Sequence, residues 1–409
     1  MRARAGTARL LRLTTLVRLA ALGATLAGCG GEVPTATSRA PSVAAAAARE
    51  TAAARWNALT RAVIGRQEFG PLGIARSYAL VSVAQYDAVI AAEDARTRGV
   101  HPSVAGAASA AAAAVLGALY PAEQGAIDAQ LAADAAYFPA LPSERDADFL
   151  AGLAVGEQVA AAVLARAATD GSTATWTGTI PAGPGYWLNA PAPAQPLSPR
   201  WGEVRPWLMT SGDQFRPAPP PAFDSPEFLT ALAEVRQYTD GRTPEQLRIA
   251  QYWQYGAGPG GPMGLFGEEA TKLAAQHHLD ERQAARTLAV MYMAIMDASI
   301  GCWDAKFAYW YIRPFQADPL ITTPVGRPNF PAYPSAHSCL SAAAAGVLAG
   351  LFPAAADALQ AQVAEAGVAR LYAGLHFHFD VSAGQELGAR VAALALERAP
   401  KGHEPIPLD

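Results

Sequence analysis

The stretch DASIGCWDAKFAYWYIRP, residues 297–314, predicts a buried helix that stops at its final proline. Its many aromatic side chains indicate burial, yet it also carries Lys306 and Arg313, which would lie two turns apart on one face of such a helix. A solvated basic face is the simpler interpretation of this pair taken alone. In a buried setting, however, two like charges require an anion. The stretch therefore predicts a helical core that encloses an anion site.

Helical periodicity continues outside this stretch, and no segment alternates long enough to predict a sheet. The predicted fold class is all-α, with two packed halves that each resemble a four-helix bundle. The first half covers about residues 49–177, and the second half covers about residues 225–400 of the helical domain 49–409. Residues 178–224 are rich in Pro, Gly and Trp and predict a long connector between the halves.

Several helix starts can be predicted from local chemistry. Ser225 and Thr243 each place a capping hydroxyl in front of a proline at the first helical position. After a Gly-Pro loop at residues 256–264, further helices are expected from Glu268 and from Glu281. In the first half, helices are expected at about residues 56–66, 74–92, 105–119, 122–136 and 143–168.

The composition excludes some classes of function. The chain has 409 residues, enough for a large core, and a formal charge of −4, so it lacks the global basic field of a nucleic-acid binder. Two uncharged stretches, residues 104–122 and 339–356, are long enough to be considered as membrane spans. Their Ala, Gly and Ser content favours buried bundle helices instead. The sequence predicts no particular oligomeric state.

The N-terminus predicts an export signal. Residues 1–28 combine several arginines with a short apolar run that ends in Leu26-Ala27-Gly28, directly before Cys29. This pattern is typical of a lipoprotein signal that is cleaved before a lipid-modified cysteine, although an ordinary signal peptide with an incidental Cys29 is an alternative. Residues 29–48 are then a flexible tether. We expect an exported protein that is lipid-anchored to a bacterial membrane and faces the periplasm or the exterior, with no other membrane contact.

Two more cysteines, Cys302 and Cys339, lie in the body of the chain. They could form a disulfide in an oxidising compartment. Each lies in an apolar helical context where buried thiols are common, so free thiols are favoured.

Two later segments carry further candidate anion ligands. Ser335, Ala336 and His337 follow an extended, proline-containing segment and open an Ala-rich helix, whose N-terminus would direct backbone N–H groups at an anion. The alternative interpretation is that Ser335 only caps the helix and that His337 lies on the surface. Farther along, Arg370 precedes His376 and Asp380, which are four residues apart. In a helix this carboxylate could accept the Nδ1 proton of the histidine and leave its Nε2 free.

The three segments together form an ordered signature. They read Lys-x6-Arg-Pro, Pro-Ser-Ala-His and Arg-x5-His-x3-Asp, in residues 306–380. This order closely resembles the signature shared by vanadium-dependent haloperoxidases and type 2 phosphatidic acid phosphatases. The pattern from Ile74 through Asp297 is also similar to the soluble bacterial haloperoxidase branch.

The resemblance implies a role for each residue of the signature. Vanadate, or phosphate in the same site, would be held through its equatorial oxygens, and the groups implied to do so are Lys306, Arg313, Arg370, Ser335 and the amide of Ala336. His376 would coordinate vanadium or attack phosphorus, His337 would act as acid or base, and Asp380 would orient His376. Ala336 departs from the glycine that is usual at its position, and Ala369 departs from a serine. If residue 336 requires a positive φ, alanine is disfavoured there.

Three functions are compatible with this site. In a haloperoxidase, Trp303 and Phe330 would match the halide-pocket residues of chloride-oxidising relatives, and Lys306 and His337 would assist the reaction of hydrogen peroxide with chloride or bromide. Ordinary aromatic core packing is the alternative interpretation of this pair. A soluble acid phosphatase would hydrolyse phosphate monoesters through a phosphohistidine at His376. An oxyanion-binding lipoprotein would bind vanadate or phosphate without turnover.

Overall fold

The computed structural model describes residues 50–66, 70–142, 145–189, 195–256 and 260–408. Cys29, the predicted signal peptide and the predicted tether lie outside these residues. Within the described chain there are thirteen α-helices and no β-strand, which confirms the all-α prediction. The α-helices are α1 (Ala52–Gly65), α2 (Pro71–Thr97), α3 (Val104–Leu119), α4 (Gln124–Tyr137), α5 (Asp146–Ala168), α6 (Pro226–Gly241), α7 (Pro244–Gln251), α8 (Pro262–Gln276), α9 (Glu281–Tyr309), α10 (Pro314–Ala317), α11 (Ala336–Leu351), α12 (Ala356–Tyr372) and α13 (His378–Arg398).

The predicted capping residues begin their helices as expected. Ser225 caps α6 through its hydroxyl, and Thr243 forms a reciprocal capping box at the start of α7. The helix start predicted at Glu268 is wrong, because α8 begins earlier. Gly261 takes a φ of 57° in front of it, and Pro262 occupies its first position, so the chain enters the helix before Glu268 is reached.

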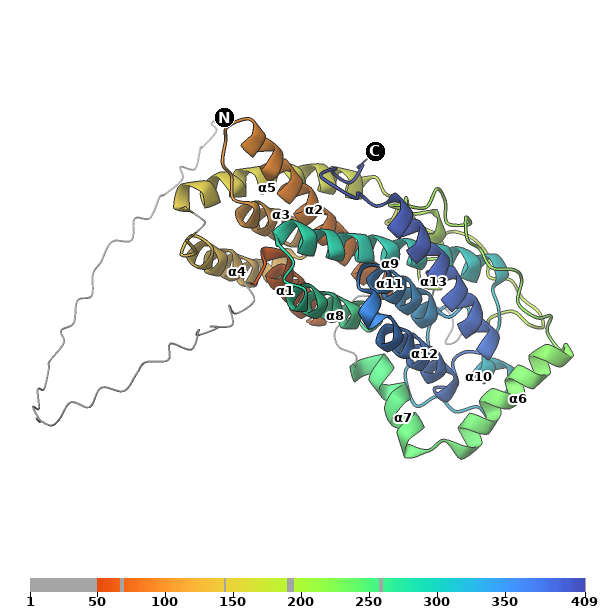
Figure 1. Cartoon of the computed structure of the whole chain (residues 1–409). Helices are drawn as coiled ribbons and strands as arrows, with labels where there is room; N and C mark the ends of the chain where they lie inside the picture. Colours follow the sequence, from red (N-terminus) through yellow and green to blue (C-terminus); the bar gives the residue numbers. More distant parts are fainter. Residues whose placement is uncertain (1–49, 67–69, 143–144, 190–194, 257–259, 409) are drawn as a thin grey trace, which may run out of the picture. The chain divides into compact units, whose positions relative to one another are not determined.

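The longest helix, α9, packs against α2 from the first half and against α11 and α13 from the second (Figure 1). Two of the described helices, α5 and α9, are long and apolar enough to span a membrane by length and composition. In α9, 94% of the apolar window is buried, so its hydropathy reflects its place in the core, whereas in α5 this share is 28%. Cys302 of α9 and Cys339 of α11 are buried and free of a disulfide, as predicted.

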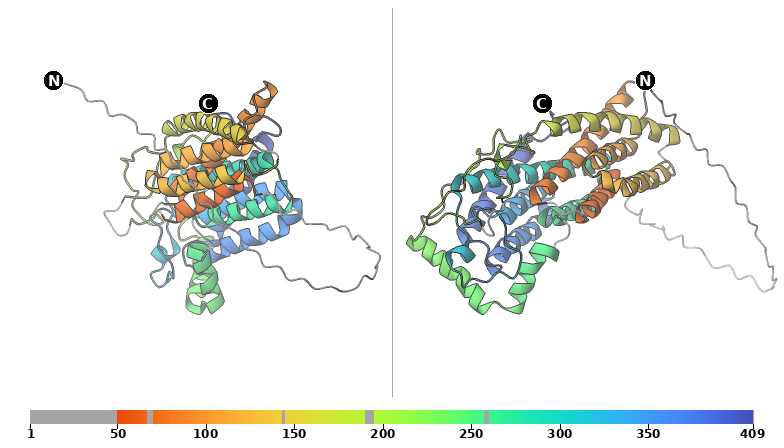
Figure 2. Two further views of the ribbon diagram at one scale, coloured as in Figure 1. Left: turned by 90° about the vertical axis from the view of Figure 1, so that its left-hand side faces the viewer. Right: turned by 180° about the vertical axis from the view of Figure 1, so that it is seen from behind.

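The two halves each contain a helix pair that packs in the same way. In Figure 2 the first half, orange to yellow, and the second half, green to blue, lie on opposite sides of the fold. A Cβ atom on Gly152 of α5 would lie 2.3 Å from the carbonyl oxygen of Ser103, and one on Gly388 of α13 would lie 2.3 Å from that of Cys339. Only glycine permits this approach, so α5 meets α3, and α13 meets α11, through direct backbone contact.

Each half also carries a buried aspartate on its long helix that accepts backbone N–H groups from an irregular segment. Asp297 of α9 accepts the N–H groups of residues 207, 208 and 209, at 2.8, 2.7 and 2.8 Å. Burial raises the pKa of Asp297 to about 6. Asp87 of α2 accepts the N–H group of Ile406 at 2.8 Å, and burial raises its pKa to about 7. These carboxylates attach the connector and the C-terminal segment to the helical core.

Replacing Asp87 with Asn is expected to raise the free energy of unfolding at about pH 8 and to leave it nearly unchanged at about pH 4. The folded pKa of Asp87, about 7, exceeds the ordinary value of 3.8, so its stabilising contribution is complete below that ordinary value. The contribution is lost as the pH rises to 7, at no more than about 1.4 kcal/mol per pH unit. Asparagine keeps an oxygen for the Ile406 N–H group and adds no charge. Urea denaturation across this pH range measures the effect, and a variant less stable than the wild type at pH 8 would contradict it.

Candidate oxyanion site

The three segments of the predicted signature meet near the C-terminal end of α9. Arg313 Nη1 lies 3.0 Å from His376 Nε2, and the N–H group of Ser335 donates to the carbonyl oxygen of Asp380 at 2.9 Å. Nearly all the predicted anion-site residues are buried, with exposed fractions of 0 to 7%; these are Lys306, Arg313, Ser335, Ala336, Arg370, His376 and Asp380. His337 is the exception, because it is partly exposed. His337 is therefore the member of this set with the most contact with solvent.

Two predictions about local helix geometry are wrong, although the side chains still converge. Trp310 takes a left-handed conformation with φ 50° and ends α9, so Arg313 does not share a helical face with Lys306. Similarly, α13 begins only after His376, so His376 and Asp380 do not lie on one helix. In both cases a turn, rather than a continuous helix, brings the two side chains to the same place.

The contacts of His376 determine its tautomer. A guanidinium group only donates, so Nε2 of His376 accepts the hydrogen bond from Arg313. Its Nδ1 donates to Asp380 Oδ2 at 2.9 Å. Burial, together with the charge of Arg313, lowers the pKa of His376 well below its ordinary value, so the ring is neutral. His376 therefore presents a lone pair on Nε2, the form required of a nucleophile or a metal ligand.

Asp380 combines this orienting contact with deep burial. Its Oδ2 also accepts the backbone N–H group of Phe377 at 3.1 Å, while its buried Oδ1 has no hydrogen-bond partner in the described chain. Burial raises the pKa of Asp380 to about 7, and the Phe377 N–H group and the nearby cations oppose this rise. The carboxyl is thus positioned to hold the Nδ1 proton of His376.

The ammonium group of Lys306 donates to three backbone carbonyls in the segment that leads into α11. These carbonyls belong to Pro331, Ala332 and Pro334. Since an ammonium group has three N–H bonds, these contacts use all of its donors. Burial lowers the pKa of Lys306 to about 8. Lys306 therefore fixes this segment and supplies charge, and a direct bond to an oxyanion requires it to release one carbonyl.

The site contains more buried positive than negative charge. Lys306, Arg313 and Arg370 are cations, and the acidic groups that act on both Lys306 and Arg313 are the buried Asp380 and the buried thiol of Cys302. Within the described chain neither Lys306 nor Arg313 forms an ion pair, and burial lowers the pKa of Arg313 to about 9. Buried cations are stable only when counter-charge is supplied. Vanadate or phosphate would supply that charge, so the residues present fit a tetrahedral oxyanion.

The start of α11 also suits an anion. Ser335 caps the helix by accepting the N–H group of Ser338. Ala336 is the first helical residue and is not among the described residues with positive φ, so alanine is well accommodated where the resembling families usually carry glycine. The N–H groups of Ala336 and His337 have no acceptor among the described residues. They can therefore donate to an anion at the helix N-terminus.

Three further contacts come from a segment that sequence reasoning missed, the end of α7 and the π-helix η3 (Tyr252–Gly256). The carbonyl oxygen of Trp253 lies 3.0 Å from His337 Nε2. Gln254 Oε1 accepts from Arg370 Nη1 at 2.9 Å, and the carbonyl oxygen of Ala250 accepts from Arg370 Nη2 at 3.2 Å. Two of the three partners are backbone carbonyls, which leave no side-chain signature in a sequence.

The two aromatic residues predicted for a halide pocket lie beside the cations. The ring centroids of Trp303 and Phe330 are 4.9 Å apart. Lys306 Nζ lies 5.2 Å from the centroid of the Phe330 ring, and Arg313 Cζ lies 5.1 Å from it. Trp303 is fully buried and donates its indole N–H to the carbonyl oxygen of Leu197 at 3.1 Å. The pair thus forms an apolar border to the cationic cluster.

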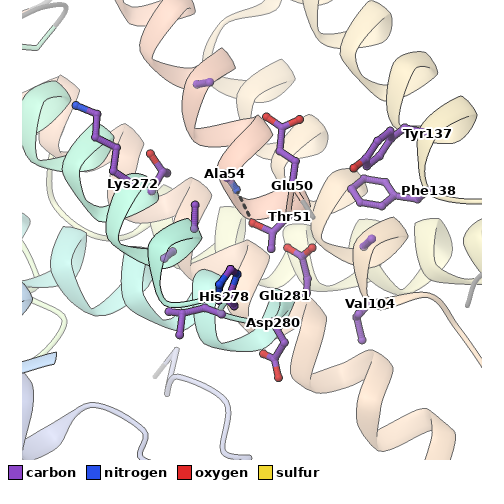
Figure 3. A pocket seen from close by; sticks show the side chains of 16 residues that line it. Glu50, Thr51, Ala54, Val104, Tyr137, Phe138, Lys272, His278, Asp280 and Glu281 are labelled. Carbon is purple, nitrogen blue, oxygen red and sulfur yellow. Dashed lines mark hydrogen bonds between the residues drawn. The ribbon is translucent and has the colours of Figure 1, made fainter. Parts of the chain in front are cut away.

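An open pocket of about 990 Å³ lies elsewhere, where the ends of α1, α3, α4, α8 and α9 meet (Figure 3). Its lining contains none of the predicted site residues. Two of its three acidic residues serve helix ends, since Glu281 accepts the N–H groups of Ala52 and Ala53 and Asp280 caps α9, while the third, Glu50, pairs with Arg55. This pocket is therefore separate from the oxyanion site.

Fold and site together define an all-α protein in which buried cations and two imidazoles from distant segments converge. Residues 286–402 match the model of the PAP2 superfamily, and this range contains the whole Lys306 to Asp380 signature. No curated protein sequence matches the chain significantly.

Three crystal structures share the fold over most of its length. The first, described as the first bacterial vanadium-dependent iodoperoxidase, is 22% identical with a TM-score of 0.73, over 84% of this chain and 95% of that one. An apo-type bacterial vanadium-dependent chloroperoxidase is 13% identical with a TM-score of 0.66, over 81% and 95% of the two chains. A holo-type bacterial vanadium-dependent chloroperoxidase is 14% identical with a TM-score of 0.65, over 84% and 96%. These likenesses establish the fold.

Proposed function

We propose that the chain is a vanadium-dependent haloperoxidase-like enzyme that uses vanadate and hydrogen peroxide to oxidise a halide. The observation that carries the proposal is the neutral His376, whose Nε2 lone pair faces the buried cations and accepts a hydrogen bond from Arg313 that a bound oxyanion would replace. The likeness of the fold to three bacterial haloperoxidases supports the same conclusion. Bound vanadate would act as a Lewis acid that activates peroxide for oxygen transfer to the halide.

Residues of this chain would bind the oxyanion, transfer protons and exclude water from the halide. Arg313, Arg370 and the helix N-terminus at Ser335 would bind the oxyanion, and Asp380 would keep the proton of His376 on Nδ1. His337, the partly exposed member, would exchange protons with the reactants. The Trp303 and Phe330 pair would exclude water from the halide.

A PAP2-type acid phosphatase is the second candidate, because the PAP2 superfamily match covers the same residues. In that reaction His376 Nε2 attacks phosphorus and the bond to the alkoxide oxygen breaks. His337 would first take up a proton and give it to the leaving alkoxide oxygen. As a neutral base it would then take a proton from the water that attacks the phosphohistidine, which releases phosphate and regenerates His376. The oxyanion geometry serves both reactions, since five-coordinate vanadate resembles the transition state of phosphoryl transfer.

One purified preparation, assayed twice, discriminates between these functions. We expect halogenation of a dye with vanadate, peroxide and chloride, bromide or iodide, and only weak hydrolysis of a phosphate monoester without vanadate. No halogenation at saturating vanadate would overturn the proposal. Phosphate hydrolysis that vanadate inhibits would then support the phosphatase, and tight vanadate binding with neither turnover would support a non-catalytic oxyanion-binding lipoprotein.

We also propose that the protein is exported and lipid-anchored through Cys29, on the strength of the arginine-rich, apolar segment that precedes this residue. Cys29→Ser is expected to change both the intact mass of the protein and its partitioning between membrane and soluble fractions, because serine has no sulfur to carry the lipid. Fractionation of producing cells followed by mass spectrometry measures both. Identical mass and partitioning of variant and wild type, corrected for the substitution, would reject the anchor.

A further inference from the structure

The π-helix η3 makes the contacts that control His337. A carbonyl oxygen can only accept, so the proton between Trp253 O and His337, 3.0 Å apart, belongs to His337 Nε2. Although part of His337 is exposed, the surrounding protein removes water from its ring, and this desolvation, with the charge of Arg370, lowers the pKa of His337 well below its ordinary value. The neutral ring therefore carries this single proton. His337 is therefore protonated on Nε2 and basic at Nδ1, the opposite tautomer to that of His376.

The side chain of Trp253 holds this carbonyl in position. Its indole is almost completely buried and packs against Ala366 and Ala369 of α12. Its Nε1 donates to Glu365 Oε1, also on α12, at 2.9 Å. Arg370 lies five residues after Glu365 on α12 and contacts the same π-helix through Gln254. The anchor therefore ties η3 to the helix that supplies one of the cations. Single π-helical turns of this kind recur at functional sites.

We propose that Trp253 is a positioning residue, whose indole, anchored by Glu365, keeps its own backbone carbonyl on His337 and thereby leaves Nδ1 of His337 as the base. The proposal rests on the proposed function for its catalytic consequence, because a base is useful only if the site turns over. Its structural part, the tautomer, does not depend on catalysis. The two parts can therefore be tested separately.

The structural part is tested by ¹⁵N NMR of the full chain labelled at histidine, with His337→Gln to assign the His337 signals. In the wild type we expect a pyrrole-type shift for Nε2 and a pyridine-type shift for Nδ1 of His337. Trp253→Phe keeps an aromatic ring but removes the indole N–H, and it should move these signals toward a tautomer mixture while those of His376 stay unchanged. If the spectra show that His337 of the wild-type chain is protonated on Nδ1, the proposal is overturned. It is also overturned if the His337 signals are unchanged in Trp253→Phe.

A second pair of variants, at Glu365, shows whether an effect of Trp253→Phe comes from the lost hydrogen bond or from misfolding. Glu365→Gln keeps an oxygen that can accept from the indole and should retain the wild-type tautomer, whereas Glu365→Ala should behave like Trp253→Phe. If the chain is active, Trp253→Phe and Glu365→Ala are expected to lower kcat about tenfold with KM changed less than about threefold, because proton transfer is impaired and binding is kept. An equal loss in Glu365→Gln would overturn the hydrogen-bond account. Wild-type inactivity in both assays would reject the proposed function and leave the NMR test valid.

Discussion

His376→Ala is expected to lower halogenation at least about 1,000-fold, in the range seen when an essential catalytic group is removed. The structure gives the reason, because His376 contributes the Nε2 lone pair that Arg313 and Asp380 orient from either side. The variant should remain folded, because Asp380 keeps the N–H group of Phe377 as a donor and Arg313 Nη1 keeps the carbonyl oxygen of Leu375 as an acceptor. Initial rates at saturating vanadate and peroxide measure the loss, and phosphate hydrolysis should fall equally if that is the activity.

His378→Ala provides a matched control two residues away. His378 is exposed, with 45% of its side chain accessible, and its Nδ1 contacts Glu234 outside the cluster. This variant should keep activity within about threefold of the wild type, as expected for a surface substitution. Activity of His376→Ala within tenfold of the wild type, or an equal loss in His378→Ala, would contradict the assignment of His376.

Asp297→Ala is expected to lower the free energy of unfolding by about 3–5 kcal/mol, the cost of breaking a buried charged network. Three N–H groups of the connector, at residues 207–209, converge on this carboxylate, and no other acceptor replaces it in the described chain. Although burial raises the pKa of Asp297, its hydrogen bonds depend on the oxygens rather than on the charge alone. Urea denaturation monitored by circular dichroism measures the loss.

Ser299→Ala is the control on the same helix. It removes the 2.9 Å hydrogen bond that Ser299 Oγ accepts from the indole N–H of Trp201 in the same connector, and the bond that this hydroxyl donates to the carbonyl oxygen of Met296 within α9. The free energy of unfolding is expected to fall by about 1 kcal/mol. If Asp297→Ala and Ser299→Ala lower the free energy of unfolding equally, the carboxylate of Asp297 does not hold the connector as described.

Much of the architecture could be predicted from the sequence because the relevant signals are local. The capping hydroxyls of Ser225 and Thr243 mark the starts of α6 and α7, and apolar periodicity marks the long helices. The predicted extent of the helix through Arg313 was wrong, since the left-handed Trp310 that ends α9 has no residue-type signature. The matching helix pairs of the two halves were also not recognised, because their glycines are hidden among many small residues.

The membership of the candidate site could be predicted, but several of its contacts could not. Spacing placed Lys306 and His376 in one signature, yet it could not reveal that Lys306 uses all its donors on carbonyls. Nor could it reveal that the carbonyl of Trp253 controls His337. These contacts depend on backbone geometry and on tertiary packing, which residue types alone do not encode.

The most direct test of the central claim is a crystal structure of the mature chain with vanadate, located by the anomalous signal of vanadium. We expect one vanadium atom bonded to His376 Nε2, with its oxygens contacted by Arg313, Arg370 and the N-terminus of α11. Vanadium bound only elsewhere, such as the pocket that contains Lys272, or no bound vanadium at saturating concentration, would contradict the account.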